Sequence, residues 1–99
     1  MIAAGERWPT GELRPALEDL LGAGAIIEAL GLHDALSPEA ETARAAWQVH
    51  RHDVLDVIRR CSSGLELASA GYAADLTIAA GHDTQDTVPI LAAGAFRST

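Results

Sequence analysis

The chain contains no lysine and only one cysteine, so it has few cationic groups and cannot form disulfides within itself. All seven basic residues are arginines, and with 14 acidic residues the net charge is −7. A protein that binds nucleic acid through the phosphate backbone needs a cationic face, so we expect no nucleic-acid partner. The lone Cys61 cannot form an internal disulfide, and we place it on the apolar side of a helix as a packing residue.

Aromatic residues and long apolar runs are also scarce. Aromatics make up 4% of the 99 residues, so the core must be aliphatic, with Trp8 and Trp47 as its two bulky anchors. No apolar run near the start is long enough for a signal peptide or a membrane span, so we expect no membrane association and a cytoplasmic protein. At this length the chain is one domain, residues 1–99, of marginal stability.

Apolar residues spaced three and four apart predict a first helix over residues 14–30. Pro15 is acceptable only in its first turn, which puts the helix start near Arg14. Glycines at 22 and 24 lower helix propensity and indicate close approach of another backbone or a ligand, packing being the commoner cause. Ser37 as cap and Pro38 at the first position predict a second helix, reaching residue 61.

The second half of the sequence predicts shorter helices and two strands. The polar run 50–53 interrupts the second helix, and Asp53 could cap its second piece; a solvated helix break is favoured over a histidine metal site. Short helices follow over 62–70 and 72–80, with Gly71 ending the first. His33 and His82 are expected to be isolated loop residues. The β-branched and apolar residues of 87–91 and 95–97 predict a terminal hairpin, so the fold is mainly α with a short C-terminal β-hairpin.

Two long blocks resemble one enzyme family. Residues 5–27 read GERWPTGELRPALEDLLGAGAII, and residues 61–96 read CSSGLELASAGYAADLTIAAGHDTQDTVPILAAGAF. In order and spacing they resemble the C-terminal half of 2-phosphosulfolactate phosphatase. The chain departs from the family at Leu65, where an arginine is usual, and at Ala93, where an aspartate is common. The resemblance implies a fragment of a larger α/β enzyme fold, with a strand ending before Gly5, most of the sheet absent, and apolar helix faces left exposed.

The resemblance also implies an activity. The family hydrolyses (R)-2-phospho-3-sulfolactate to sulfolactate and phosphate with Mg²⁺, a step toward coenzyme M in methanogens, and bacterial members without that pathway can have a different substrate. In this sequence Arg7 and Arg14 could bind phosphate or sulfonate oxygens, and Ser63 begins a helix whose N-terminus favours an anion. Glu6, Glu18 and Asp19 are the candidate metal ligands. The catalytic group is not identified.

Other interpretations remain open. Arg14 and Glu18 are four residues apart and, on one helix, would form a simple exposed ion pair. Ser63 could be a cap alone. The chain as a whole could be a non-catalytic interaction or remnant domain, which pairs with itself as a homodimer or with a separate N-terminal half, and composition alone permits an acidic four-helix regulator.

Overall fold

The computed structural model describes residues 5–98, and it is mainly helical. The strand end expected before Gly5 lies outside the described residues. The elements in chain order are β1 (Glu6–Arg7), β2 (Leu13–Arg14), α1 (Leu17–Leu30), a 3₁₀ turn (His33–Ala35), α2 (Pro38–His50), α3 (Val54–Arg60), α4 (Ser62–Ser69), α5 (Ala73–Ala79), β3 (Pro89–Ala92) and β4 (Ala95–Ser98). Within the described residues, no helix has the length and apolar character needed to cross a membrane.

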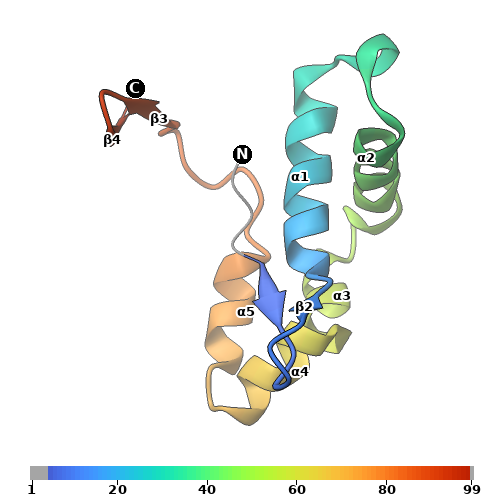
Figure 1. Cartoon of the computed structure of the whole chain (residues 1–99), viewed down its shortest axis with the longest axis vertical. Helices are drawn as coiled ribbons and strands as arrows, with labels where there is room; N and C mark the ends of the chain where they lie inside the picture. The colour runs from blue at the N-terminus through green and yellow to red at the C-terminus, as the bar shows by residue number, and fades with distance from the viewer. Residues whose placement is uncertain (1–4, 99) are drawn as a thin grey trace.

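Helices α1 and α2 form an antiparallel pair, and α3, α4 and α5 lie below it in Figure 1. The core cluster consists of Leu21 and Ala25 on α1, Trp47 on α2 and Val57 on α3. Trp47 is 7% exposed and is the bulky anchor that we expected, whereas the prediction for Trp8 is wrong, because its side chain is 43% exposed. The core is therefore small and depends on a single aromatic residue.

Gly24 is buried where α1 crosses α2. A Cβ atom at this position would meet the carbonyl oxygen of Ala43 and lie 2.7 Å from Cβ of Trp47. Gly22, two residues earlier, has open space around it, with no atom within 4 Å of a Cβ built there. Helix packing, the commoner explanation for a glycine inside a helix, therefore accounts for Gly24 but not for Gly22.

Helix α1 begins at Leu17, so the predicted start near Arg14 is wrong. Arg14 instead lies in β2, where it is opposite Glu6 of β1 in an antiparallel pair. The residue before a proline is disfavoured in the helical region, and Ala16, after Pro15, is still extended with φ −107° and ψ 106°. The proline therefore separates the strand from the helix instead of opening the helix.

The start of α2 follows its local sequence. Oγ of Ser37 accepts a hydrogen bond from the backbone N–H of Ala40 at 3.3 Å, and Pro38 occupies the first helical position. The predicted break is also present, because α2 ends at His50 and α3 begins at Val54. Asp53 stands at the N-cap of α3, but its side chain makes no capping hydrogen bond, so that part of the prediction is wrong.

The C-terminal strands form the expected hairpin, which Figure 1 shows extending away from the helices. In its register Leu91 pairs with Phe96, and every residue of both strands is exposed. The turn residues Ala93 and Gly94 have φ of 50° and 77°, the left-handed conformation that two-residue hairpin turns require. Alanine tolerates this conformation less well than glycine or aspartate.

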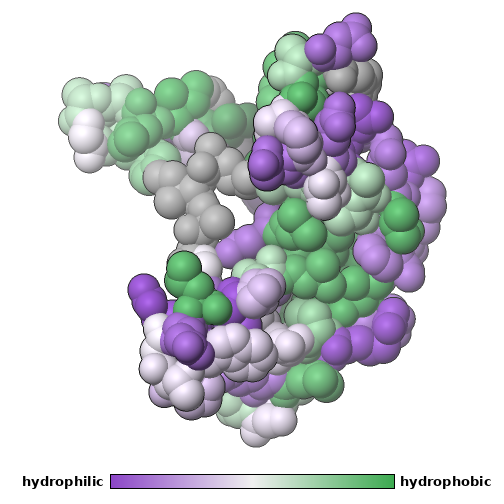
Figure 2. Space-filling model, turned by 45° about the vertical axis from the view of Figure 1, so that its right-hand side comes forward, coloured by the Kyte–Doolittle hydropathy of each residue, from purple (hydrophilic) through white to green (hydrophobic). Residues whose placement is uncertain are grey.

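Apolar surface is also exposed on α1, as we expected for helix faces that the sheet of a larger fold would cover. Ile26 and Leu30 are 47% and 62% exposed. Figure 2 shows apolar side chains across the middle of the helical body and over much of the hairpin. Exposed apolar area of this extent is typical of a surface that another chain segment covers.

The contact at Gly24 can be tested by adding a single methyl group. We expect Gly24→Ala to lower the free energy of unfolding by about 1–3 kcal/mol, because α1 and α2 must move apart to accept it. Gly22→Ala is the matched control and should be neutral or stabilising by up to about 1 kcal/mol through helix propensity. Urea denaturation followed by circular dichroism measures both, and equal effects would contradict the packing argument.

Candidate functional site

Arg14 is the centre of the polar contacts that join the β1–β2 strands to α4. Its side chain is 6% exposed. The Nη2 atom donates to Oε2 of Glu66 at 2.8 Å and to Oγ of Ser63 at 3.3 Å, and lies 3.4 Å from Oε2 of Glu6. The indole of Trp8 lies against the guanidinium, with its ring centre 5.3 Å from Cζ. The site therefore combines β1, β2 and the first turns of α4.

These contacts fix the charge of Arg14. The hydrogen bond to the Glu66 carboxylate raises the pKa of Arg14 above its ordinary value, and attraction to Glu6 and Glu18 adds to the effect, while burial opposes it. A cation whose pKa is raised on folding stabilises the folded state at every pH below its unfolded pKa, and this is lost only as the pH rises through the higher folded value. Arg14 is thus a permanent cation near neutral pH.

Helix α4 begins directly after α3, and Ser63 in its first turn contacts Arg14. Gly64 follows it, and a Cβ at Gly64 would collide with the carbonyl oxygen of Ile58, so only glycine allows this approach. Sγ of Cys61 accepts a hydrogen bond from the Gly64 N–H at 3.5 Å and donates to the Ile58 carbonyl at 3.1 Å. The thiol, which is half-buried, therefore holds the turn between α3 and α4.

The other predicted site residues contact different groups. Nη1 of Arg7 donates to the carbonyl oxygen of Gly11 at 2.7 Å, within the β1–β2 turn. Oδ2 of Asp19 accepts from the Gly5 N–H at 3.0 Å, and Oε2 of Glu18 lies 3.9 Å from Sγ of Cys61. Arg14, Ser63 and Glu6 are thus brought into direct contact, whereas Arg7, Glu18 and Asp19 are not.

The predicted carboxylates do not assemble into a metal centre by themselves. Across residues 5–98, no group of three or more His, Cys, Asp or Glu side chains is arranged to hold a metal ion. Glu6 is already engaged with Arg14, and Asp19 with the backbone. Because Mg²⁺ needs oxygen ligands in octahedral geometry, this arrangement would require ligands from outside the described residues.

The alternative of an Arg14–Glu18 helix pair is wrong. Arg14 precedes α1, and the carboxylates that it contacts belong to Glu6 and Glu66. Sequence reasoning missed Glu66, because its partner is 52 residues away and no local spacing indicates the contact. The only related prediction concerned Ser63, three residues before Glu66, which was expected at a helix N-terminus that favours an anion.

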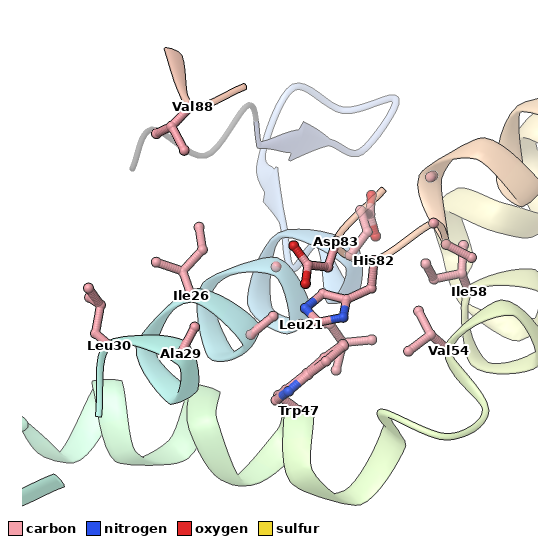
Figure 3. Close-up of a pocket in the computed structure, with 16 residues that line it drawn as sticks. Leu21, Ile26, Ala29, Leu30, Trp47, Val54, Ile58, His82, Asp83 and Val88 are labelled. Atoms are coloured by element: carbon pink, nitrogen blue, oxygen red, sulfur yellow. The ribbon is translucent and has the colours of Figure 1, made fainter. Parts of the chain in front are cut away.

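A separate apolar groove of about 530 Å³ is lined by α1, Trp47 of α2, α3 and the segment after α5. Figure 3 shows the imidazole of His82 lying against the indole of Trp47, with Leu21 and Val54 nearby. The two ring centres are 4.7 Å apart. His82 is a loop residue, as expected, but it is not isolated, because its exposed ring contacts Trp47 and lines the groove.

Comparisons with known proteins agree with the sequence resemblance. A family model described as 2-phosphosulpholactate phosphatase matches residues 2–94. A curated protein of Gloeobacter violaceus, named "Probable 2-phosphosulfolactate phosphatase", is 34% identical over 74 residues, which cover 75% of this chain. The match spans only 30% of that protein's length. No solved structure matches the chain.

The role of Arg14 in stability can be separated from that of an ordinary surface arginine. We expect Arg14→Gln to lower the melting temperature by several degrees, because Glu6, Ser63 and Glu66 lose their shared partner. Arg60→Gln breaks only the exposed pair with Asp56 and should change the free energy of unfolding by less than about 0.5 kcal/mol. Thermal denaturation at about pH 6 and about pH 9 should give the same deficit for Arg14→Gln, since Arg14 stays charged. A deficit no larger than that of Arg60→Gln would contradict this structural role.

Proposed function

The chain belongs to the 2-phosphosulfolactate phosphatase family, and we propose that it is part of an enzyme that hydrolyses (R)-2-phospho-3-sulfolactate to sulfolactate and phosphate. The observation that supports a shared site is the contact of Arg14 with Ser63 and Glu66, which links the two blocks of sequence that resemble the family. Because the match spans 30% of the Gloeobacter protein, the reaction belongs to a larger polypeptide or complex.

In the proposed reaction a water oxygen bonds to phosphorus and the bond from phosphorus to the ester oxygen breaks. The ester oxygen takes up a proton to become the hydroxyl of sulfolactate. The substrate is highly anionic, so the site must offer fixed cations and hydrogen-bond donors. Arg14, with its forked donors, and Ser63, at the start of α4, are the proposed oxyanion-binding groups, and the more exposed Arg7 is a second cation nearby in sequence.

We also propose that the complete enzyme uses Mg²⁺, which would neutralise charge on the phosphoryl oxygens. Glu6, Glu18 and Asp19 are the candidate contributors from this chain, together with ligands from the rest of the protein. The half-buried thiol of Cys61 is compatible with the cytoplasm, the proposed location, where such groups stay reduced.

Phosphate release from racemic 2-phosphosulfolactate with Mg²⁺ tests this function. We expect activity from a polypeptide that carries this chain together with the rest of the family's sequence, and little from residues 1–99 alone. In the active form, Arg14→Gln should reduce kcat/KM by about 10²-fold or more if Arg14 binds a transferred or anchoring oxyanion. Arg60→Gln, on an exposed helix surface, should leave kcat/KM unchanged. Absence of activity in the complete form would refute the proposed substrate.

A second candidate function is a non-catalytic interaction domain, and the C-terminal hairpin favours it. Neighbouring residues of a strand point to opposite faces, so Leu91 and Phe96 share one face while Ile90 lies on the other. All three are at least half exposed. An isolated two-stranded hairpin is marginally stable, and apolar residues on both faces suit a strand pair covered on two sides. The cover would be a second copy or a separate polypeptide with the rest of the family's sequence.

Self-association through the hairpin predicts a concentration-dependent mass. We expect the chain to form dimers in sedimentation velocity at tens of micromolar, and Phe96→Asp to shift it to monomer, because a carboxylate cannot be buried unpaired. Thr87→Asp, which adds the same charge just before β3, should not change the mass. A wild-type chain that is monomeric throughout would exclude the homodimer and leave the separate polypeptide as the partner.

A further inference from the structure

The oxygen contacts of Arg14 converge on one of its nitrogens. Glu66, Ser63 and Glu6 all contact Nη2, at 2.8, 3.3 and 3.4 Å. Nε is buried and has no hydrogen-bond partner among the described residues. Nε and Nη2 are neighbouring donors on one edge of the guanidinium, the edge that binds carboxylate or phosphate through two parallel hydrogen bonds. Half of this fork is therefore unused.

Glu66 differs in exposure from the arginine that it neutralises. Its side chain is 63% exposed, whereas that of Arg14 is 6% exposed. Glu66 lies one turn after Ser63 on α4, and its carboxylate is open to solvent while it contacts Arg14. It also binds with one oxygen, to Nη2, and leaves Nε unsatisfied. A carboxylate held in this way can leave the site without a change in the helix backbone.

We propose that Glu66 is a displaceable internal anion, whose carboxylate occupies the place on Arg14 where a tetrahedral oxyanion, a phosphate or sulfonate group, binds. The inference rests on the proposed function, because it assigns the incoming anion to the substrate class. With more oxygens than a carboxylate, such a group can accept from both Nε and Nη2 and from Oγ of Ser63. The exchange replaces one anion by another, so Arg14 is never left as an unpaired buried charge.

Competition by Glu66 would make the site selective. Any free anion must displace a carboxylate that is tethered beside Arg14, so anions with no other contact bind weakly. Glu6 remains 3.4 Å from Nη2 and adds repulsion. Only a ligand that makes further contacts elsewhere in the complete protein can displace Glu66, overcome the repulsion by Glu6 and still bind tightly.

The test is recovery of stability by added anion. Glu66→Ala and Glu66→Gln remove the internal anion, and the melting temperature of each is measured by circular dichroism against sodium phosphate or sodium methanesulfonate, at constant ionic strength balanced with chloride. Asp56→Ala is the matched control, because it removes the carboxylate of an ion pair at a similar distance, 2.9 Å, whose arginine, Arg60, is 66% exposed. Phosphate and methanesulfonate separate the two ends of the proposed substrate.

We expect both Glu66 variants to melt lower than wild type in chloride and to recover with at least one of the two anions. At a tenfold excess of anion over its Kd the increase should be about 6 °C or more. Wild type and Asp56→Ala should need at least about tenfold more anion for the same increase. If Glu66→Ala is unfolded in chloride, its refolding with anion is the readout.

Glu66 variants that recover no more than Asp56→Ala, or stay unfolded at every anion concentration, would overturn the inference. This result is distinguishable from failure of the proposed function. Loss of anion recovery with intact phosphatase activity in the complete protein would make Glu66 a purely structural partner. Recovery without such activity would leave an oxyanion site whose substrate is a different phosphate or sulfonate compound.

Discussion

The buried guanidinium of Arg14 is the constraint on which the polar half of this structure depends. A buried cation must be matched by anions and hydrogen-bond acceptors, because its desolvation is otherwise uncompensated. The match here comes from Glu6 on β1 and from Ser63 and Glu66 on α4. The position of α4 relative to the β1–β2 turn is thus tied to one side chain. The close approach at Gly64 then fixes α4 against α3.

Local sequence predicted most of the helices and strands, but not the contacts between them. Ser37 and Pro38 define the start of α2, and the β-branched and apolar residues near the C-terminus predict the hairpin, because cap and strand preferences act within a few residues. The start of α1 was misjudged because Pro15 fits both the first turn of a helix and the end of a strand. Only the pairing of Arg14 with Glu6 decides between them.

In the candidate site, too, the sequence predicted individual residues but not all of their tertiary contacts. Arg14, Ser63 and Glu6 were identified from residue type and family resemblance, and they meet in the structure. Glu66 was not identified, and neither was the contact between Trp47 and His82, because these partners are brought together only by tertiary packing. Trp8 was assigned to the core on residue type alone, yet it is 43% exposed and its ring lies over the guanidinium of Arg14. A metal assignment for Glu6, Glu18 and Asp19 stays a prediction.

The contacts of Arg14 also bear on the order of folding. Each one to α4 closes a loop of about fifty residues, with sequence separations of 49 and 52. Such closures cost chain entropy before they return any stability, so local helices and the α1–α2 pair should form earlier. The same contacts connect α4, most of whose residues are exposed, to a pair of two-residue strands. The contacts around Arg14 are therefore the region where partial opening of the native state would begin, and an anion bound at the proposed site would protect its amides from hydrogen exchange first.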